Sequence, residues 1–127
     1  MRHELRRYPE RTTFIHSLRI AFTGLWIALI RERHLKVHLI AGLLVLVLAA
    51  LSGFGRLEWI VLILTISLVI VAELMNTAVE LTVDLFTRQQ KLRAKLAKDV
   101  AASAVLVASL SSIVIGAFLF YNKWVGH

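Results

Sequence analysis

Three long apolar stretches alternate with polar segments along this chain, and each is long enough for a membrane-spanning helix. An α-helix rises about 1.5 Å per residue, so about twenty residues cross the roughly 30 Å hydrocarbon layer of a bilayer. The pattern predicts membrane helices at residues 35–54, 57–86 and 100–121. Because the second of these is longer than a bilayer requires, its C-terminal end should extend past the membrane surface. We expect one all-α integral membrane domain that covers residues 1–127.

Residues 14–33 show a different pattern, in which apolar side chains recur every three or four positions and arginines occupy other positions. This periodicity is typical of an amphipathic helix. Because Trp26 and several isoleucines widen the apolar face, we expect this helix to lie in the head-group layer rather than across the membrane. On the residues alone, a surface anchor without chemical function is as good an interpretation as an active one.

Composition and charge support the membrane location. The chain of 127 residues is 58% hydrophobic, has a mean hydropathy of +0.75 and contains no cysteine, which excludes disulfides and thiolate ligands. The net charge of +7 would fit a nucleic-acid partner, but the basic residues are distributed as in a membrane protein. Most precede the first apolar stretch or lie between the second and third, namely Arg2, Arg6, Arg7, Arg11, Arg19, Arg31, Arg33, Lys36, Arg88, Lys91, Arg93, Lys95 and Lys98.

Only Arg56 and Lys123 lie on the alternate sides of the predicted spans. Cytoplasmic loops of membrane proteins contain the excess of Lys and Arg. The N-terminus and residues 87–99 should therefore be cytoplasmic, and residues 52–58 and the C-terminus should lie outside. We expect no nucleic-acid partner.

A polar stripe interrupts the apolar pattern near the end of the second predicted span. Glu73, Asn76, Glu80 and Asp84 are spaced by three, four and four residues, which places them within an arc of about 80° on one helix face. A carboxylate near the bilayer core costs about 3 kcal/mol on insertion scales, so this group needs a compensating partner such as a cation. Carboxylate and amide oxygens suit Mg²⁺, which commonly bridges substrate phosphates. Hydrogen bonding between packed helices is the alternative explanation.

Two further segments place charged side chains at the same membrane depth. Lys98 can pair with a phosphate group, and Asp99 lies at the predicted start of the third span, where its side chain could cap the helix. Glu32 is the acid within a basic stretch and could be a metal ligand or part of a surface salt bridge. His34 and His38 could bind a metal, but an interfacial basic pair fits better because no His-Glu-x-x-His pattern is present.

Two linked motifs resemble the prokaryotic diacylglycerol kinase family. They are Glu73-Leu-Met-Asn76-Thr77-Ala-Val-Glu80-Leu-Thr-Val-Asp84 and Ala97-Lys98-Asp99-Val-Ala-Ala-Ser103-Ala-Val-Leu. The resemblance extends over residues 14–120. It implies a three-span enzyme with an N-terminal surface helix, active as a homotrimer in the bacterial inner membrane. Such an enzyme uses Mg²⁺ and ATP to phosphorylate a lipid alcohol at the cytoplasmic face.

The resemblance also implies roles for individual residues. Glu73 would be the general base on the lipid hydroxyl, and Glu32 and Glu80 would hold Mg²⁺ on the ATP phosphates. Four further residues would contact or support the nucleotide, namely Asn76, Asp84, Lys98 and Asp99. Phosphoryl transfer needs charge neutralisation and alignment more than covalent chemistry, which suits this set of side chains. Ser103 departs from the glycine often found at its position in the family, which affects helix packing rather than the chemistry.

The substrate stays open between two lipid alcohols. The forms Asn-Thr-Ala-Val-Glu and Ala-Lys-Asp-Val-Ala-Ala look more like the undecaprenol kinase branch than the branch that uses diacylglycerol. A different class is a small oligomeric membrane protein that uses its acids as cation ligands without catalysis. That class predicts acids along a path through the whole bilayer, whereas the acids here cluster near the cytoplasmic end. Three thin helices cannot bury these polar groups alone, so either class predicts a homo-oligomer.

Overall fold

The computed structural model describes residues 13–87, 89 and 91–126. This part of the chain is entirely helical, with α1 at Phe14–Arg31, α2 at Arg33–Leu51, α3 at Arg56–Phe86 and α4 at Leu92–Trp124. All four helices are long and apolar enough to cross a membrane. The expectation of an all-α integral membrane protein is therefore confirmed at this level. Five of the arginines in the charge argument lie outside the described residues, namely Arg2, Arg6, Arg7, Arg11 and Arg88.

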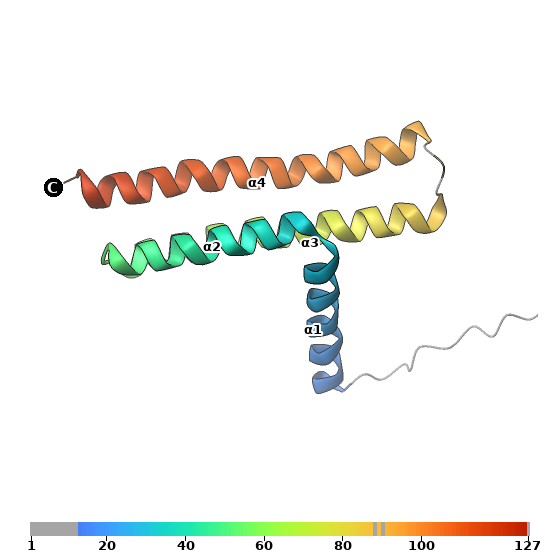
Figure 1. Ribbon diagram of the computed structural model, residues 1–127, viewed down its shortest axis with the longest axis horizontal. Coiled ribbons are helices and arrows are strands. Elements are labelled where there is room, and N and C mark those ends of the chain that lie inside the picture. The colour runs from blue at the N-terminus through green and yellow to red at the C-terminus, as the bar shows by residue number, and fades with distance from the viewer. Residues whose placement is uncertain (1–12, 88, 90, 127) are drawn as a thin grey trace, which may run out of the picture.

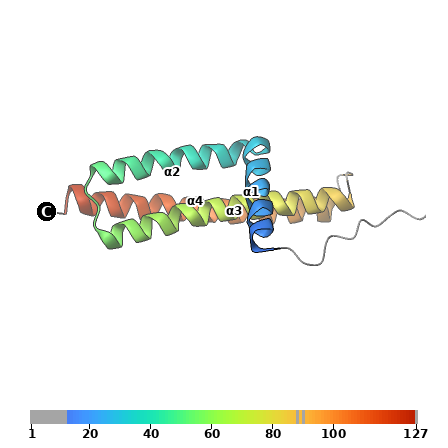
Figure 2. The ribbon, with the colours of Figure 1, turned by 90° about the horizontal axis from the view of Figure 1, so that it is seen from below.

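The helices α2, α3 and α4 run side by side, whereas α1 lies transverse to them (Figures 1 and 2). Helix α3 packs against both α2 and α4. Within this set of three, successive helices run in opposite directions because short connections join them (Figure 1). The polar stripe is on α3 and thus lies within reach of both neighbouring helices.

Helices α2 and α3 pack along a seam with a seven-residue repeat. Leu35, Gly42 and Ala49 are the buried residues of α2, and Leu62 and Val69 continue the seam on α3. This repeat is typical of helices that cross at a shallow angle with interlocking side chains. At Gly42 the helices approach so closely that an added Cβ would lie 3.0 Å from a side-chain methyl group of Ile66.

The connection between α2 and α3 is a tight turn. Gly53 has a φ of +68°, a conformation that other residues rarely adopt. The Gly55 N–H donates a hydrogen bond of 2.5 Å to the Glu58 carboxylate, which caps the start of α3. The Trp124 indole donates a hydrogen bond of 3.1 Å to the Ser52 hydroxyl and so fastens the end of α4 to this turn.

Aromatic side chains close the bundle at the same end. Phe54 packs against Trp59 and Phe120, and Phe120 packs against Trp124. Trp59, Trp124 and Tyr121 belong to the residue types that are enriched at membrane–water interfaces. Although Trp124 contacts this aromatic cluster, both Trp124 and Tyr121 are exposed.

Helix α4 begins much earlier than the predicted third span. It starts at Leu92, so most of the segment expected to be a loop is helical and the connection from α3 is short. The suggestion that Asp99 caps this helix is wrong, because Asp99 lies two turns inside it. As a result α3 and α4 extend together beyond the start of α2 (Figure 1).

Few apolar side chains in the described part of the chain are buried. Large residues on every helix are exposed, including Phe22, Leu44, Leu64 and Phe118. Such a surface is stable only against lipid or other protein, because burying apolar area contributes about 25 cal/mol per Å². The exposure agrees with the membrane character of the four helices.

Candidate active site

The polar stripe of α3 passes from a buried to an exposed environment along the helix. Glu73 and Thr77 are buried, with 5% and 6% of their surface exposed. Seven residues beyond Glu73, Glu80 is half-buried, and the Asp84 side chain is 44% exposed. One face of α3 therefore presents three carboxylates, of which Glu73 is buried and Glu80 and Asp84 are partly or largely exposed.

Glu73 contacts a histidine on the neighbouring helix. The His38 Nε2 atom lies 3.1 Å from Glu73 Oε1 and comes from α2. Sequence reasoning treated His38 and His34 as an interfacial basic pair, but His38 faces α3 whereas His34 is exposed. The signal that could have found this contact is helical phase, because His38 lies between Leu35 and Gly42 on the buried seam of α2.

The next turn of α3 has a polar side chain with an unused acceptor. The Asn76 amide donates a hydrogen bond of 3.1 Å to Glu80 Oε1. The Asn76 Oδ1 atom is buried and accepts no hydrogen bond from the described residues. The Thr77 hydroxyl donates to the backbone carbonyl of Glu73, which leaves the Glu73 carboxylate to its partner on α2. A buried amide oxygen without a donor is available to a ligand or a metal ion.

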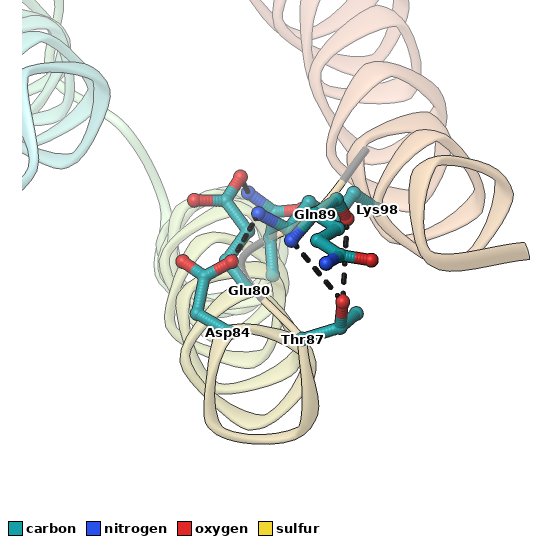
Figure 3. Close-up of polar contacts among 6 residues, drawn as sticks. Glu80, Asp84, Thr87, Gln89 and Lys98 are labelled. Carbon is teal, nitrogen blue, oxygen red and sulfur yellow. Dashed lines mark hydrogen bonds and ion pairs between the residues drawn. The ribbon is translucent and has the colours of Figure 1, made fainter. Parts of the chain in front are cut away.

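Charged residues from α3 and α4 meet at the exposed end of the stripe. Lys98 Nζ lies 2.5 Å from Asp84 Oδ1, and Figure 3 shows this lysine reaching from α4 to the side of α3 that also presents Glu80. Lys95 pairs with Asp99 on α4 at 2.6 Å. Both ion pairs are substantially exposed, so they contribute little to stability and can be exchanged for a ligand.

An open pocket of about 510 Å³ lies beside these ion pairs. Residues from the end of α3, the connection and the first turns of α4 line it, including Asp84, Thr87, Lys91, Lys95 and Lys98. Thr87 and Gln89 hydrogen-bond to each other at its edge (Figure 3). Three lysines around one opening make a favourable site for a polyanion.

Glu32 lies at the junction between α1 and α2, where its side chain is 22% exposed and contacts Arg31 at 3.4 Å. The contact between His38 and Glu73 fixes the register of α2 against α3. Glu32 is six residues before His38, and Glu80 is seven residues after Glu73. Because the two helices are antiparallel, both steps run about 10 Å toward the same end of the bundle. Glu32 and Glu80 therefore lie at a similar depth.

These residues fit a magnesium ion that shares its coordination with a substrate. The described residues contain no group of three or more His, Cys, Asp or Glu side chains close enough to hold a metal by themselves. Mg²⁺ keeps several waters and commonly uses one or two carboxylates plus phosphate oxygens. Glu80, which accepts a hydrogen bond from Asn76, and Glu32, at a similar depth, match that requirement in the type of ligand.

An apolar groove of about 510 Å³ lies between α2 and α4, with α3 as its floor. His38 lines one end of this groove, and Ser109 from α4 is among its lining residues. The Ser109 hydroxyl is buried and has no hydrogen-bond partner among the described residues. The pair of Glu73 and His38 therefore adjoins the apolar groove. The charged pocket lies about three helical turns further along α3, at Asp84.

Fold and site together define an integral membrane protein with a buried carboxylate near a cationic pocket at one end of its bundle. The model for "Prokaryotic diacylglycerol kinase" matches residues 19–120, and the chain belongs to that family. The resemblance in the two motifs is therefore confirmed, and the protein is a lipid kinase with an alcohol acceptor.

The relatives of this chain differ in the substrate that their names give. The chain is 38% identical to an undecaprenol kinase of Bacillus subtilis over 122 residues, which is 96% of this chain and 94% of the relative. It is also 38% identical to a diacylglycerol kinase of Synechocystis over 104 residues, or 81% of this chain and 59% of that protein. A diacylglycerol kinase of Escherichia coli is 27% identical over 113 residues, which is 89% of this chain and 93% of the relative.

Proposed function

We propose that this protein transfers the γ-phosphate of ATP, as its magnesium complex, to a membrane lipid alcohol at the cytoplasmic face of the bacterial inner membrane. The observation that carries this proposal is the burial of Glu73 between apolar helices, a few turns from a pocket lined by three lysines. A lipid hydroxyl can approach a carboxylate from the membrane, and a polyanionic nucleotide can approach the lysines from water.

In the proposed reaction Glu73 is the general base that accepts the proton of the lipid hydroxyl. Its carboxylate accepts the proton of the lipid hydroxyl while that oxygen forms a bond to the γ-phosphorus of ATP. The bond from the γ-phosphorus to the bridging oxygen breaks, and ADP leaves with the electron pair. A positioned base contributes about 10²–10⁴-fold to such a reaction. Positioning and electrostatic stabilisation supply the rest.

Acids and lysines of the exposed end are proposed to bind the nucleotide. Glu32 and Glu80 would hold Mg²⁺, which neutralises phosphate charge when it is bound, and Asn76 would complete or orient this set. Lys98 would exchange its contact with Asp84 for a phosphate oxygen, so that Asp84 supports the lysine when the site is empty. The bound Mg²⁺ and Lys98 would thereby offset part of the negative charge of the triphosphate.

Asp99 is proposed to contact the nucleoside part of ATP rather than its phosphates. Its carboxylate would repel a phosphate but can accept hydrogen bonds from a base or a ribose. In the structure its partner is Lys95, one turn earlier on α4. Lys95 lines the pocket, so this ion pair connects Asp99 to the pocket wall.

We propose undecaprenol as the preferred acceptor and diacylglycerol as the second candidate. The relative named undecaprenol kinase matches 94% of its length to this chain, whereas the equally identical diacylglycerol kinase of Synechocystis matches 59% of its own length. Both lipids present a hydroxyl at the membrane surface, so the same residues can serve either.

The proposed membrane arrangement has three spans, a surface helix and three copies of the chain. The transverse direction of α1 supports its place in the head-group layer, since the other three helices run side by side (Figure 2). The end of the bundle formed by α3 and α4 beyond α2 would then project into the cytoplasm. The exposed apolar side chains leave surface for lipid and for further copies of the chain, and the number three follows from the family resemblance.

The test offers two lipids to the purified, assembled protein in mixed detergent micelles. Labelled γ-phosphate from ATP should appear in the undecaprenol fraction faster than in the diacylglycerol fraction, and omission of Mg²⁺ should stop both transfers. Faster transfer to diacylglycerol would reverse the substrate assignment. No transfer to either lipid, from an oligomer with intact helical content, would contradict the proposed function.

A further inference from the structure

We propose that His38 is a positioning residue for the phosphoryl transfer. Its Nε2 atom lies 3.1 Å from Oε1 of Glu73, and in the proposed role this contact fixes the direction in which the second carboxylate oxygen points. The inference rests on the proposed role of Glu73 as the base. It extends that role to α2, a helix to which the sequence motifs assign no part in the chemistry.

The contact is between a buried acid and a partly exposed histidine. The side chain of Glu73 is 6% exposed, that of His38 is 26% exposed, and their polar atoms are 3.1 Å apart. Among the described residues, His38 is the polar side chain that contacts this carboxylate. A buried carboxylate without a donor is costly, and a hydrogen bond to a charged acceptor is among the stronger ones. Contact with His38 therefore stabilises the buried Glu73 carboxylate when no substrate is bound.

Glu73 needs such a partner because its own helix does not orient it. A glutamate side chain rotates about three bonds, and the neighbouring hydroxyl of Thr77 is engaged with the backbone instead. The imidazole is held by its place on the seam of α2, between Leu35 and the close contact of Gly42 with Ile66. A donor that is fixed by packing restricts the carboxylate to fewer directions.

A fixed carboxylate matters for rate rather than for substrate binding. With Oε1 occupied by His38, the other oxygen is left to accept the proton of the lipid hydroxyl. Loss of correct orientation by about 1 Å can cost about 10²-fold in rate. Because His38 does not line the lysine pocket, it should leave nucleotide binding unchanged.

The experiment compares three substitutions of His38 in the full-length assembled protein. His38→Gln keeps an N–H donor near the position of Nε2, whereas His38→Leu removes it and His38→Asn places the amide too close to the backbone. We expect kcat to fall about 10-fold to 100-fold in His38→Leu and His38→Asn, with KM for ATP and lipid within about twofold of wild type. We expect His38→Gln to recover most of the rate.

A matched control comes from the same helix. His34 is exposed and lies one turn before His38, so His34→Leu should leave kcat unchanged. Wild-type kcat in His38→Leu would overturn the inference, and so would equal loss in His38→Gln and His38→Leu. Helical content and oligomer mass of each variant, measured in the same detergent, separate a positioning defect from misfolding. If His38→Leu fails to fold, the comparison of His38→Gln with His38→Asn decides the question.

A parallel variant separates this inference from the proposed function. If Glu73→Gln retains wild-type transfer, Glu73 is not the base and the proposed chemistry fails with it. If Glu73→Gln is inactive while His38→Leu has full activity, only the inference about His38 fails.

Discussion

Burial decides what each charged side chain of this protein can do. Glu73 is enclosed by helices and meets a single histidine, whereas Asp84 is open to solvent and meets Lys98. An exposed ion pair contributes little to stability and exchanges readily with a ligand. A buried acid instead keeps its partner and is shielded from water, which is the setting in which a general base can be tuned. The two acids of one stripe thus suit different tasks.

Replacing Lys98 with methionine should weaken ATP binding more than it weakens the fold. The variant lacks the ammonium group that contacts a phosphate oxygen. We therefore expect KM for ATP to rise about tenfold, as for one lost charge-assisted hydrogen bond. Initial rates over a range of ATP concentrations provide the measurement. Lys123→Met, at the opposite end of the same helix, is the control. An unchanged KM in Lys98→Met would remove this lysine from the nucleotide site.

The metal assignment predicts a change in the magnesium requirement. Glu32→Gln and Glu80→Gln should each raise the Mg²⁺ concentration at half-maximal rate about 10-fold, because each removes a charged ligand. Glu58→Gln is a suitable control, since Glu58 caps α3 at the other end of the bundle. Identical magnesium titrations in both variants and wild type would place the metal elsewhere.

At the scale of helices, the close contact of α2 with α3 positions the site. The register that pairs His38 with Glu73 depends on the approach at Gly42, where an added Cβ would lie 3.0 Å from Ile66. Gly42→Val should force the helices apart, and overpacking of this kind costs about 1–3 kcal/mol. We expect a lower midpoint in thermal melts followed by circular dichroism in detergent. Gly24→Val, where nothing lies within 4 Å of the added Cβ, should leave the midpoint unchanged; equal midpoints in the two variants would contradict the proposed packing.

The sequence predicted some helices well and others poorly for physical reasons. The predicted boundaries of the second span, 57–86, lie within one residue of α3 because an apolar run with polar ends is a strong signal. The early start of α4 was missed because hydropathy detects apolar segments and not charged helices. The region between Lys91 and Asp99 is basic, but Leu92 and Leu96 lie one turn apart and each residue type in it is compatible with a helix.

In the candidate site, contacts within one helix could be predicted from the sequence, whereas contacts between helices could not. The stripe on α3 follows from helical periodicity, so its four members could be found from spacing alone. The contacts of His38 with Glu73 and of Lys98 with Asp84 join different helices, and they depend on how those helices align. That alignment is set by packing along the whole seam, which no single motif encodes.

At the scale of the whole molecule, the proposed orientation in the membrane can be tested by labelling. The chain has no cysteine, so single cysteines can be introduced without background. In intact spheroplasts, a membrane-impermeant thiol reagent should modify Asn122→Cys, near the end of α4. It should reach Gln89→Cys, in the connection between α3 and α4, only after permeabilisation. The reverse pattern would invert the proposed topology.

The most direct test of Glu73 as the general base is the rate of lipid phosphorylation by the Glu73→Gln variant. The substitution keeps the shape of the side chain and removes its ability to accept a proton. We expect transfer of labelled phosphate from ATP to fall below about 1% of the wild-type rate, as for loss of a general base. Helical content and oligomer mass should stay the same. Retention of more than a few per cent of the rate would show that Glu73 is not the base and that the reaction centre lies elsewhere.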